Sequence, residues 1–98
     1  MDEATLRREL VTVCRRAYER GMISGTDGNV SGRLTHDRLL VTPAGVNKGY
    51  LEPGDLVEVD LEGQPVLGGR PSTEVLLHTA VYKVRPDAIG VVHAHPPI

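Results

Sequence analysis

Two histidines separated by one residue, His93 and His95, are the sharpest chemical signal in the sequence. In a β-strand, alternate side chains point to the same face, and two residues span about 6.6 Å of backbone. Two imidazoles at that spacing can converge on one ion, with Zn–N bonds of about 2.0–2.1 Å. Val91 and Val92 precede the pair and favour a strand. Two polar residues at an exposed strand end are the alternative, and the pattern alone does not decide between them.

A third metal ligand is not obvious, although zinc sites usually have at least three protein ligands. The other candidates are His36, Asp27, Glu74 and His78. Glu74 lies in the predicted first turn of a helix, where a carboxylate is stabilised by free amides and the helix dipole. Without further context that structural role is favoured over a role as general acid and base beside a metal. His78 follows four residues later on the same helix face, and a packed or hydrogen-bonded histidine is favoured there over a ligand.

Two segments have residues suited to binding an anion. The turn-rich residues 25–29 include glycines that let the backbone approach closely, and Asn29 adds a side-chain amide donor. This stretch matches neither a Walker loop nor the dinucleotide fingerprint, so a plain turn between helix and strand is favoured on this stretch alone. Ser72 and Thr73, at a predicted helix start, offer hydroxyls and amides suited to phosphate.

Hydrophobic periodicity predicts the two helices that position these residues. The first covers residues 3–20 and ends before Gly21, with a predicted core face of Leu6, Leu10, Val13, Cys14 and Ala17. On that face Cys14 is expected to be a packed thiol and not a nucleophile. The second covers residues 72–84 with Ser72 as N-cap, and its predicted buried side is Leu76, Leu77, Ala80, Val81 and Val84.

Alternation and β-branched residues predict the strands. A hairpin is expected over residues 30–34 and 38–41, a half-buried strand over residues 57–61, and a last strand over residues 88–95. The chain of 98 residues shows no internal repeat, low-complexity segment or linker, so we expect residues 1–98 to belong to one domain.

Composition excludes several classes of function. The formal net charge of -2, from 11 basic and 13 acidic residues, offers no electrostatic basis for binding nucleic acid or an anionic membrane. The one cysteine cannot form an intrachain disulfide, which fits a reducing compartment. No apolar run approaches the roughly 20 residues of a membrane helix, and the start lacks a secretory pattern. We therefore expect a cytoplasmic soluble protein.

Four short motifs follow one another in an informative order: Gly28-Asn29-Val30-Ser31, Thr42-Pro43-Ala44-Gly45, Arg70-Pro71-Ser72-Thr73-Glu74 and Val91-Val92-His93-Ala94-His95-Pro96. In this order they resemble the class II aldolase/adducin family, which includes fuculose-phosphate aldolase. The resemblance runs through essentially the whole chain, which looks like the amino-terminal half of one family domain. It implies an α/β fold, with three α/β/α layers around a mostly antiparallel central sheet that is incomplete in this chain.

The resemblance also implies a site. It places Zn²⁺, or another divalent cation, between His93, His95 and a third histidine beyond Ile98. It makes Glu74 the proton-transfer carboxylate. It assigns the substrate phosphate to Gly28, Asn29, Gly45, Ser72 and Thr73. Ala44 stands where several sugar-phosphate members have a hydroxyl residue, which removes one possible phosphate donor, whereas Thr73 keeps the hydroxyl of a frequent serine.

The activity implied is that of a metal-dependent lyase, which reversibly cleaves a small ketose phosphate by aldol chemistry through a zinc-stabilised enediolate. Family members are expected to be homotetramers. Epimerases, dehydratases and decarboxylases share the scaffold, so they remain alternatives. A non-catalytic adducin-like interaction module is another, although such members would be expected to lack the metal-binding histidines. The 98 residues alone could also be inactive.

Overall fold

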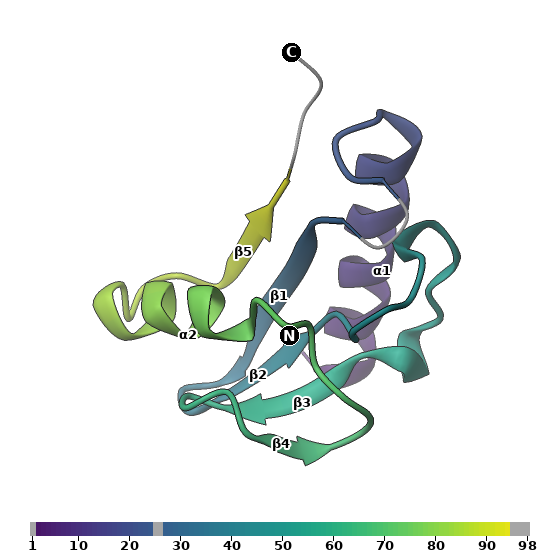
Figure 1. Cartoon of the computed structure of the whole chain (residues 1–98). Helices are drawn as coiled ribbons and strands as arrows, with labels where there is room; N and C mark the ends of the chain where they lie inside the picture. The colour runs from purple at the N-terminus through teal and green to yellow at the C-terminus, as the bar shows by residue number, and fades with distance from the viewer. Residues whose placement is uncertain (1, 25–26, 95–98) are drawn as a thin grey trace.

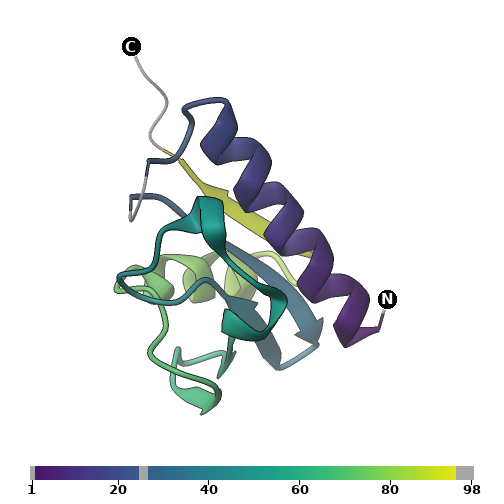
Figure 2. The same cartoon turned by 90° about the vertical axis from the view of Figure 1, so that its right-hand side faces the viewer.

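The centre of the fold is one antiparallel sheet, in a computed structural model that describes residues 2–24 and 27–94 (Figure 1). Within these residues the strands are β1 (Asn29–Thr35), β2 (Arg38–Val41), β3 (Val57–Asp60), β4 (Pro65–Leu67) and β5 (Gly90–His93). They lie in the order β4-β3-β2-β1-β5, and every neighbouring pair is antiparallel. The helices α1 (Glu3–Glu19) and α2 (Val75–Val84) cover opposite faces (Figure 2). The predicted three-layer α/β/α architecture is confirmed.

Alternating strand side chains divide the core into two clusters, one under each helix. On the α1 side, the helix packs against Val30, Leu40, Leu51 and Leu56. On the α2 side, the cluster consists of Leu39, Val41, Val57, Val59, Val75 and Tyr82. Both clusters consist mainly of aliphatic side chains. Among the described residues, Tyr82 is the one aromatic residue that is buried in either cluster.

Helix α1 begins as predicted and ends one residue early, and its buried residues are Leu10, Val11, Cys14 and Ala17. The Asp2 side chain caps it by accepting a 2.7 Å hydrogen bond from the Thr5 N–H, and Gly21 follows the helix end with φ +72°. Val13, predicted in the core, is 38% exposed, whereas Val11 is buried at 6%. The cause is that α1 contacts two 3₁₀ turns as well as the sheet, η1 (Lys48–Tyr50) and η2 (Pro53–Asp55). These turns cover the side of the helix that includes Val11.

Helix α2 begins later than predicted. Its first residue is Val75, and Ser72 lies before it in an extended connection that is bridged to the chain after β2. The Ser72 Oγ accepts a 3.2 Å hydrogen bond from the Glu74 N–H in the turn that precedes the helix. The predicted helix start was therefore three residues early, and the predicted N-cap was wrong, because Glu74 and not Ser72 occupies that position.

The predicted buried side of α2 was wrong. Leu76, Leu77 and Val84 are 64%, 47% and 76% exposed. The residues that face the sheet are Val75, His78, Thr79 and Tyr82. The inward side includes polar groups because β1 presents hydrogen-bond partners to them. Hydrophobicity alone could not indicate this orientation.

The remaining differences concern strand ends. β4 was not predicted, since its three residues are exposed and show no alternation. β3 stops at Asp60, whose Oδ1 accepts 2.9 Å hydrogen bonds from the N–H groups of Glu62 and Gln64 and so forms the turn into β4. β5 begins at Gly90, two residues after the predicted start. Among the described residues, no helix has the length and apolar character to cross a membrane.

Replacing Gly49 by alanine should destabilise the fold, because η1 packs tightly on α1 at this position. A Cβ atom on Gly49 would lie 2.6 Å from Cδ1 of Tyr18. The overpacking should lower the free energy of unfolding by about 1–3 kcal/mol, measured by urea denaturation. Gly69→Ala is the matched control, since nothing lies within 4 Å of its Cβ position. Equal stability of the two variants would contradict the packing of η1 on α1.

Candidate active site

A carboxylate and an imidazole from different elements meet beside the end of β5. The Oε2 atom of Glu74 lies 2.9 Å from Nδ1 of His93, and both side chains remain partly exposed. Glu74 occupies the N-cap position of α2, and His93 is the last residue of β5. A carboxylate next to an imidazole can exchange a proton with a substrate or contribute to holding a cation.

The Glu74 carboxylate does not cap helix α2, although it lies at the start of that helix. The Glu74 side chain makes no capping hydrogen bond to α2. The backbone N–H of Glu74 donates instead to Ser72 Oγ. The carboxylate therefore points to His93 and not to the helix amides. This orientation leaves Glu74 available for chemistry.

The donor set fits a divalent cation in part. Imidazole nitrogen is a normal zinc ligand, and His93 supplies one. His95, the other predicted ligand, lies outside the described residues. Over residues 2–24 and 27–94, no group of three or more His, Cys, Asp and Glu side chains converges on a possible metal position. His36 is exposed in the turn between β1 and β2, away from this pair.

Asn29 lies directly across from His93 in the sheet. The two residues are register partners in the antiparallel pair of β1 and β5. Side chains of opposite residues project to the same face with Cβ atoms about 4.5–5.5 Å apart. Asn29, one of the predicted phosphate residues, is therefore adjacent to the Glu74–His93 pair.

A buried hydrogen-bonded chain continues from Asn29 into α2. The Oδ1 atom of Asn29 is bonded to Nε2 of His78, whose Nδ1 lies 2.6 Å from Oγ of Ser31. Ser31 Oγ in turn lies 2.9 Å from the Tyr82 hydroxyl. His78 is thus the hydrogen-bonded histidine that was favoured over a ligand. Burial, with a smaller effect of the nearby His93, lowers the pKa of His78 to about 4.

Backbone hydrogen bonds bring the second and third sequence motifs together. The Ala44 N–H donates to the Arg70 carbonyl and the Ser72 N–H donates to the Thr42 carbonyl, each at 2.9 Å. Thr42 is also bonded to β1, since its N–H donates to Val30 O at 3.0 Å. The motif that contains Gly45 therefore lies beside Ser72 and next to the start of β1.

The predicted phosphate residues differ in exposure. Gly45 and Thr73 are exposed, and Gly45 has φ +71° in the turn after Ala44. Ser72 is buried at 7% and Asn29 at 2%. The structure thus places these residues around one end of the sheet, some at its surface and others within it.

Gly28 permits the close packing of the loop before β1. Its φ is +80°, and a Cβ atom there would lie 3.0 Å from the His93 carbonyl oxygen and would also clash with Ile23. Glycine is therefore required for two reasons, conformation and space. This packing role exists beside any contact of Gly28 with a phosphate.

Lys48 was missed by sequence reasoning. It is 2% exposed, and it lies near enough to Cys14, Asp27 and Glu74 for their charges to act on it. Burial lowers the pKa of Lys48, and these three groups act in the opposite direction. In the sequence, Asn47-Lys48-Gly49 resembles an exposed turn, so the pattern does not indicate that Lys48 is buried.

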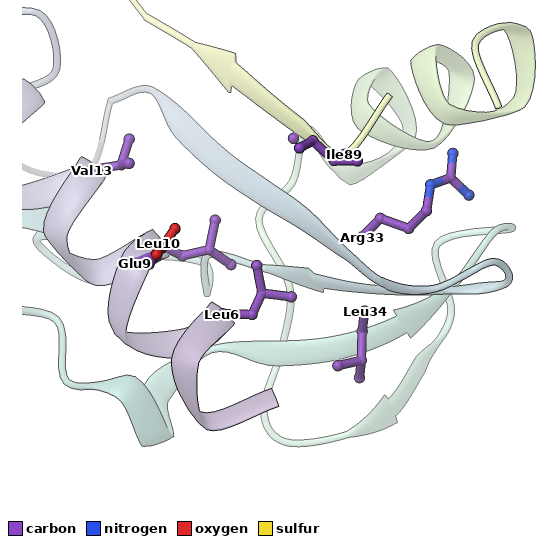
Figure 3. Close-up of a pocket in the computed structure, with 8 residues that line it drawn as sticks. Leu6, Glu9, Leu10, Val13, Arg33, Leu34 and Ile89 are labelled. Atoms are coloured by element: carbon purple, nitrogen blue, oxygen red, sulfur yellow. The ribbon is translucent and has the colours of Figure 1, made fainter. Parts of the chain in front are cut away.

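The chain also contains an apolar cavity that lies apart from these residues. It has a volume of about 450 Å³ and lies on the α1 side of the sheet, against β1 and the chain at the start of β5 (Figure 3). Its lining includes Leu6, Leu10, Leu34 and Ile89. Glu74 and His78 are on the opposite face, so the cavity is not part of the candidate site.

Comparison with known proteins gives the same family throughout. The family model for the class II aldolase and adducin N-terminal domain matches residues 8–98. A methylthioribulose-1-phosphate dehydratase from Acidiphilium cryptum is 44% identical over 94% of this chain and 44% of its own length. A 5-methylthioribulose-1-phosphate/5-deoxyribulose-1-phosphate aldolase from Escherichia coli is 39% identical over 97% of this chain and 44% of its own length.

A solved structure agrees with these relatives. YgbL from Klebsiella pneumoniae superimposes with a TM-score of 0.92 at 38% identity, covering 98% of this chain and 46% of that protein. The chain therefore spans slightly less than half the length of the proteins it matches.

The stability of the protein should fall between pH 7 and pH 4.5 in part because of His78. The pKa of His78 is about 4 in the folded chain against 6.5 for a free histidine, so the unfolded chain takes up a proton first as the pH falls. The loss should reach on the order of 3 kcal/mol near the lower pKa. Urea unfolding with EDTA present checks this.

His78→Gln is the comparison, since it removes the titrating group and leaves Glu74 and His93 in place. The parent should be the more stable protein at pH 7, and its advantage should shrink as the pH falls. An advantage that stays constant with pH would contradict a lowered His78 pKa.

Proposed function

Because the chain belongs to the class II aldolase and adducin family, we propose that the protein is a metal-dependent lyase acting on a small phosphorylated sugar. The reaction we propose is reversible aldol cleavage of a ketose phosphate. The observation that carries the proposal is the 2.9 Å approach of Glu74 to His93 beside Asn29. It combines a proton-transfer group, a metal-type ligand and an amide donor at one end of the sheet.

The residues would divide the work as follows. His93 and His95 would hold a divalent cation, with a further ligand from beyond Ile98. When bound, that cation would supply positive charge to offset the negative charge that carbon–carbon cleavage leaves on the substrate. Glu74 would move a proton between carbon and oxygen of the substrate, since its carboxylate is turned away from α2.

The phosphate would be held away from the reacting carbons by Gly28, Asn29, Gly45, Ser72 and Thr73. Contacts to a part of the substrate that does not react fix the reacting atoms against Glu74 and His93. Such remote binding energy accelerates the reaction only when it is used to position those atoms. The proximity of the motifs that contain Gly45 and Ser72 supports this grouping.

A dehydratase is the second candidate, because a dehydratase is among the similar proteins. The Acidiphilium relative is a dehydratase and the Escherichia coli relative an aldolase, yet both are named for methylthioribulose-1-phosphate. Incubation with ketose 1-phosphates followed by mass spectrometry separates the two reactions. Cleavage yields two smaller carbon fragments, whereas dehydration yields one product that has lost water.

An adducin-like module without catalysis and a homotetrameric assembly are tested by simpler measurements. Absence of a bound divalent ion from the purified full-length protein would favour the non-catalytic module. Sedimentation equilibrium would give the number of subunits. A cytoplasmic location, which we also propose, is tested by fractionation of the source cells.

Replacing Glu74 by glutamine should retain the metal and abolish most turnover. Glutamine preserves the shape of the side chain but cannot accept a proton, so kcat should fall by about 10²–10⁴-fold. Steady-state assays with a ketose phosphate and metal analysis measure the two effects. Glu19→Gln, an exposed change on α1, is the control and should retain the parent rate. Turnover at the parent rate in Glu74→Gln would show that Glu74 has no role in proton transfer.

Replacing His93 by alanine should remove most of the bound divalent ion, because an imidazole ligand is lost. We expect metal affinity to fall at least about tenfold, measured by plasma mass spectrometry after dialysis. His36→Ala is the matched control, since His36 is exposed in the β1–β2 turn. Metal content that is unchanged in His93→Ala and lost in His36→Ala would reverse the assignment.

A further inference from the structure

We propose that His78 is a positioning residue that holds the Asn29 side chain with its amide N–H groups turned toward the substrate phosphate. The inference rests on the proposed function, in which Asn29 contacts the phosphate. His78 itself touches no reacting atom in this arrangement. It acts by fixing the direction in which a neighbouring donor points.

The hydrogen bond between His78 and Asn29 has a defined direction. A carboxamide oxygen can only accept, so the partner of Asn29 Oδ1 must donate. Nε2 of His78 therefore has the proton. With its oxygen engaged in this way, the Asn29 carboxamide must turn its nitrogen to the other side.

The rest of the chain maintains this direction. A neutral imidazole has one donor and one acceptor, so Nδ1 of His78 must accept the 2.6 Å hydrogen bond from the Ser31 hydroxyl. Ser31 has then used its only proton, and its oxygen accepts from the Tyr82 hydroxyl at 2.9 Å. Every member has one role, and reversing the Asn29 amide would require the whole chain to reverse.

Burial makes the arrangement rigid. Asn29, Ser31, His78 and Tyr82 are each 1–2% exposed, so water cannot readily substitute for a missing partner. The Tyr82 end is fixed further by Arg33, whose guanidinium carbon lies 4.9 Å from the ring centroid. The orientation of Asn29 is therefore set before any ligand arrives.

This orientation matters for an anion. Among the hydrogen bonds of the described residues, none uses the Asn29 Nδ2 donors, whereas Oδ1 is occupied by His78. An amide nitrogen attracts a phosphate oxygen, and an amide oxygen in the same place would repel it. Asn29 is also the register partner of His93, which places its amide beside the Glu74–His93 pair.

Two substitutions of His78 separate orientation from packing. In His78→Gln the side-chain nitrogen can occupy the place of Nε2 and still donate to Asn29. In His78→Asn the shorter side chain reaches only the place of Nδ1 and leaves Asn29 free to rotate. Both variants keep a buried carboxamide, so they differ mainly in the bond that the proposal invokes.

The probe is inorganic phosphate, titrated into the full-length protein by calorimetry. His78→Asn should weaken phosphate binding at least about tenfold, and His78→Gln should stay within about threefold of the parent. In steady-state assays His78→Asn should lower kcat/KM for a ketose phosphate at least about tenfold, and His78→Gln should stay within about threefold of the parent. With the dephosphorylated ketose the two variants should not differ. Equal phosphate affinity in parent and His78→Asn overturns the proposal.

A spectroscopic measurement decides the matter even where a variant fails to fold. The ¹⁵N shifts and two-bond couplings of His78 in the parent protein distinguish the two tautomers. The proton on Nε2 supports the proposal, and a proton on Nδ1 overturns it. Failure of the proposed function looks different: phosphate binding would still depend on His78 while no sugar phosphate is converted. A parent protein that does not bind phosphate overturns the role given to Asn29 and this inference with it.

Discussion

The antiparallel register between β1 and β5 is the constraint on which the site depends. It sets Asn29 opposite His93 and Ser31 opposite Val91. Because side chains alternate between the faces of a sheet, a slip of one residue would turn His93 to the α1 side and away from Glu74. The other parts of the site, including the start of α2, are arranged around this one pairing.

The orientation of α2 shows how polar bonding can override hydrophobic pattern. Its outer side has Leu76, Leu77 and Val84, and its inner side has His78 and Tyr82. A buried polar side chain is costly unless it is bonded, and here Ser31 and Asn29 on β1 supply the partners. The helix is therefore positioned by specific bonds to the sheet as much as by apolar contact.

Much of the architecture was predictable from the sequence, because α1, the β1–β2 hairpin and β3 have strong local periodicity. The inward face of α2 was not, since it depends on β1 residues far along the chain. The packed position of Val11 depends likewise on η1 and η2. For the site, motif order identified Glu74 and His93, which the structure brings together. Lys48 has no local signature, and its burial arises only from tertiary packing.

The residues of the site are far apart in the sequence. Asn29 lies on the first strand that the structure describes and His93 on the last. Contacts between segments so distant form slowly, because a long stretch of chain must close before they gain any stability. During synthesis, the portion up to α2 can leave the ribosome and collapse before β5 is available. The pairing of β5 with β1, and with it the approach of His93 to Asn29 and Glu74, would therefore follow the collapse of the segments that precede it.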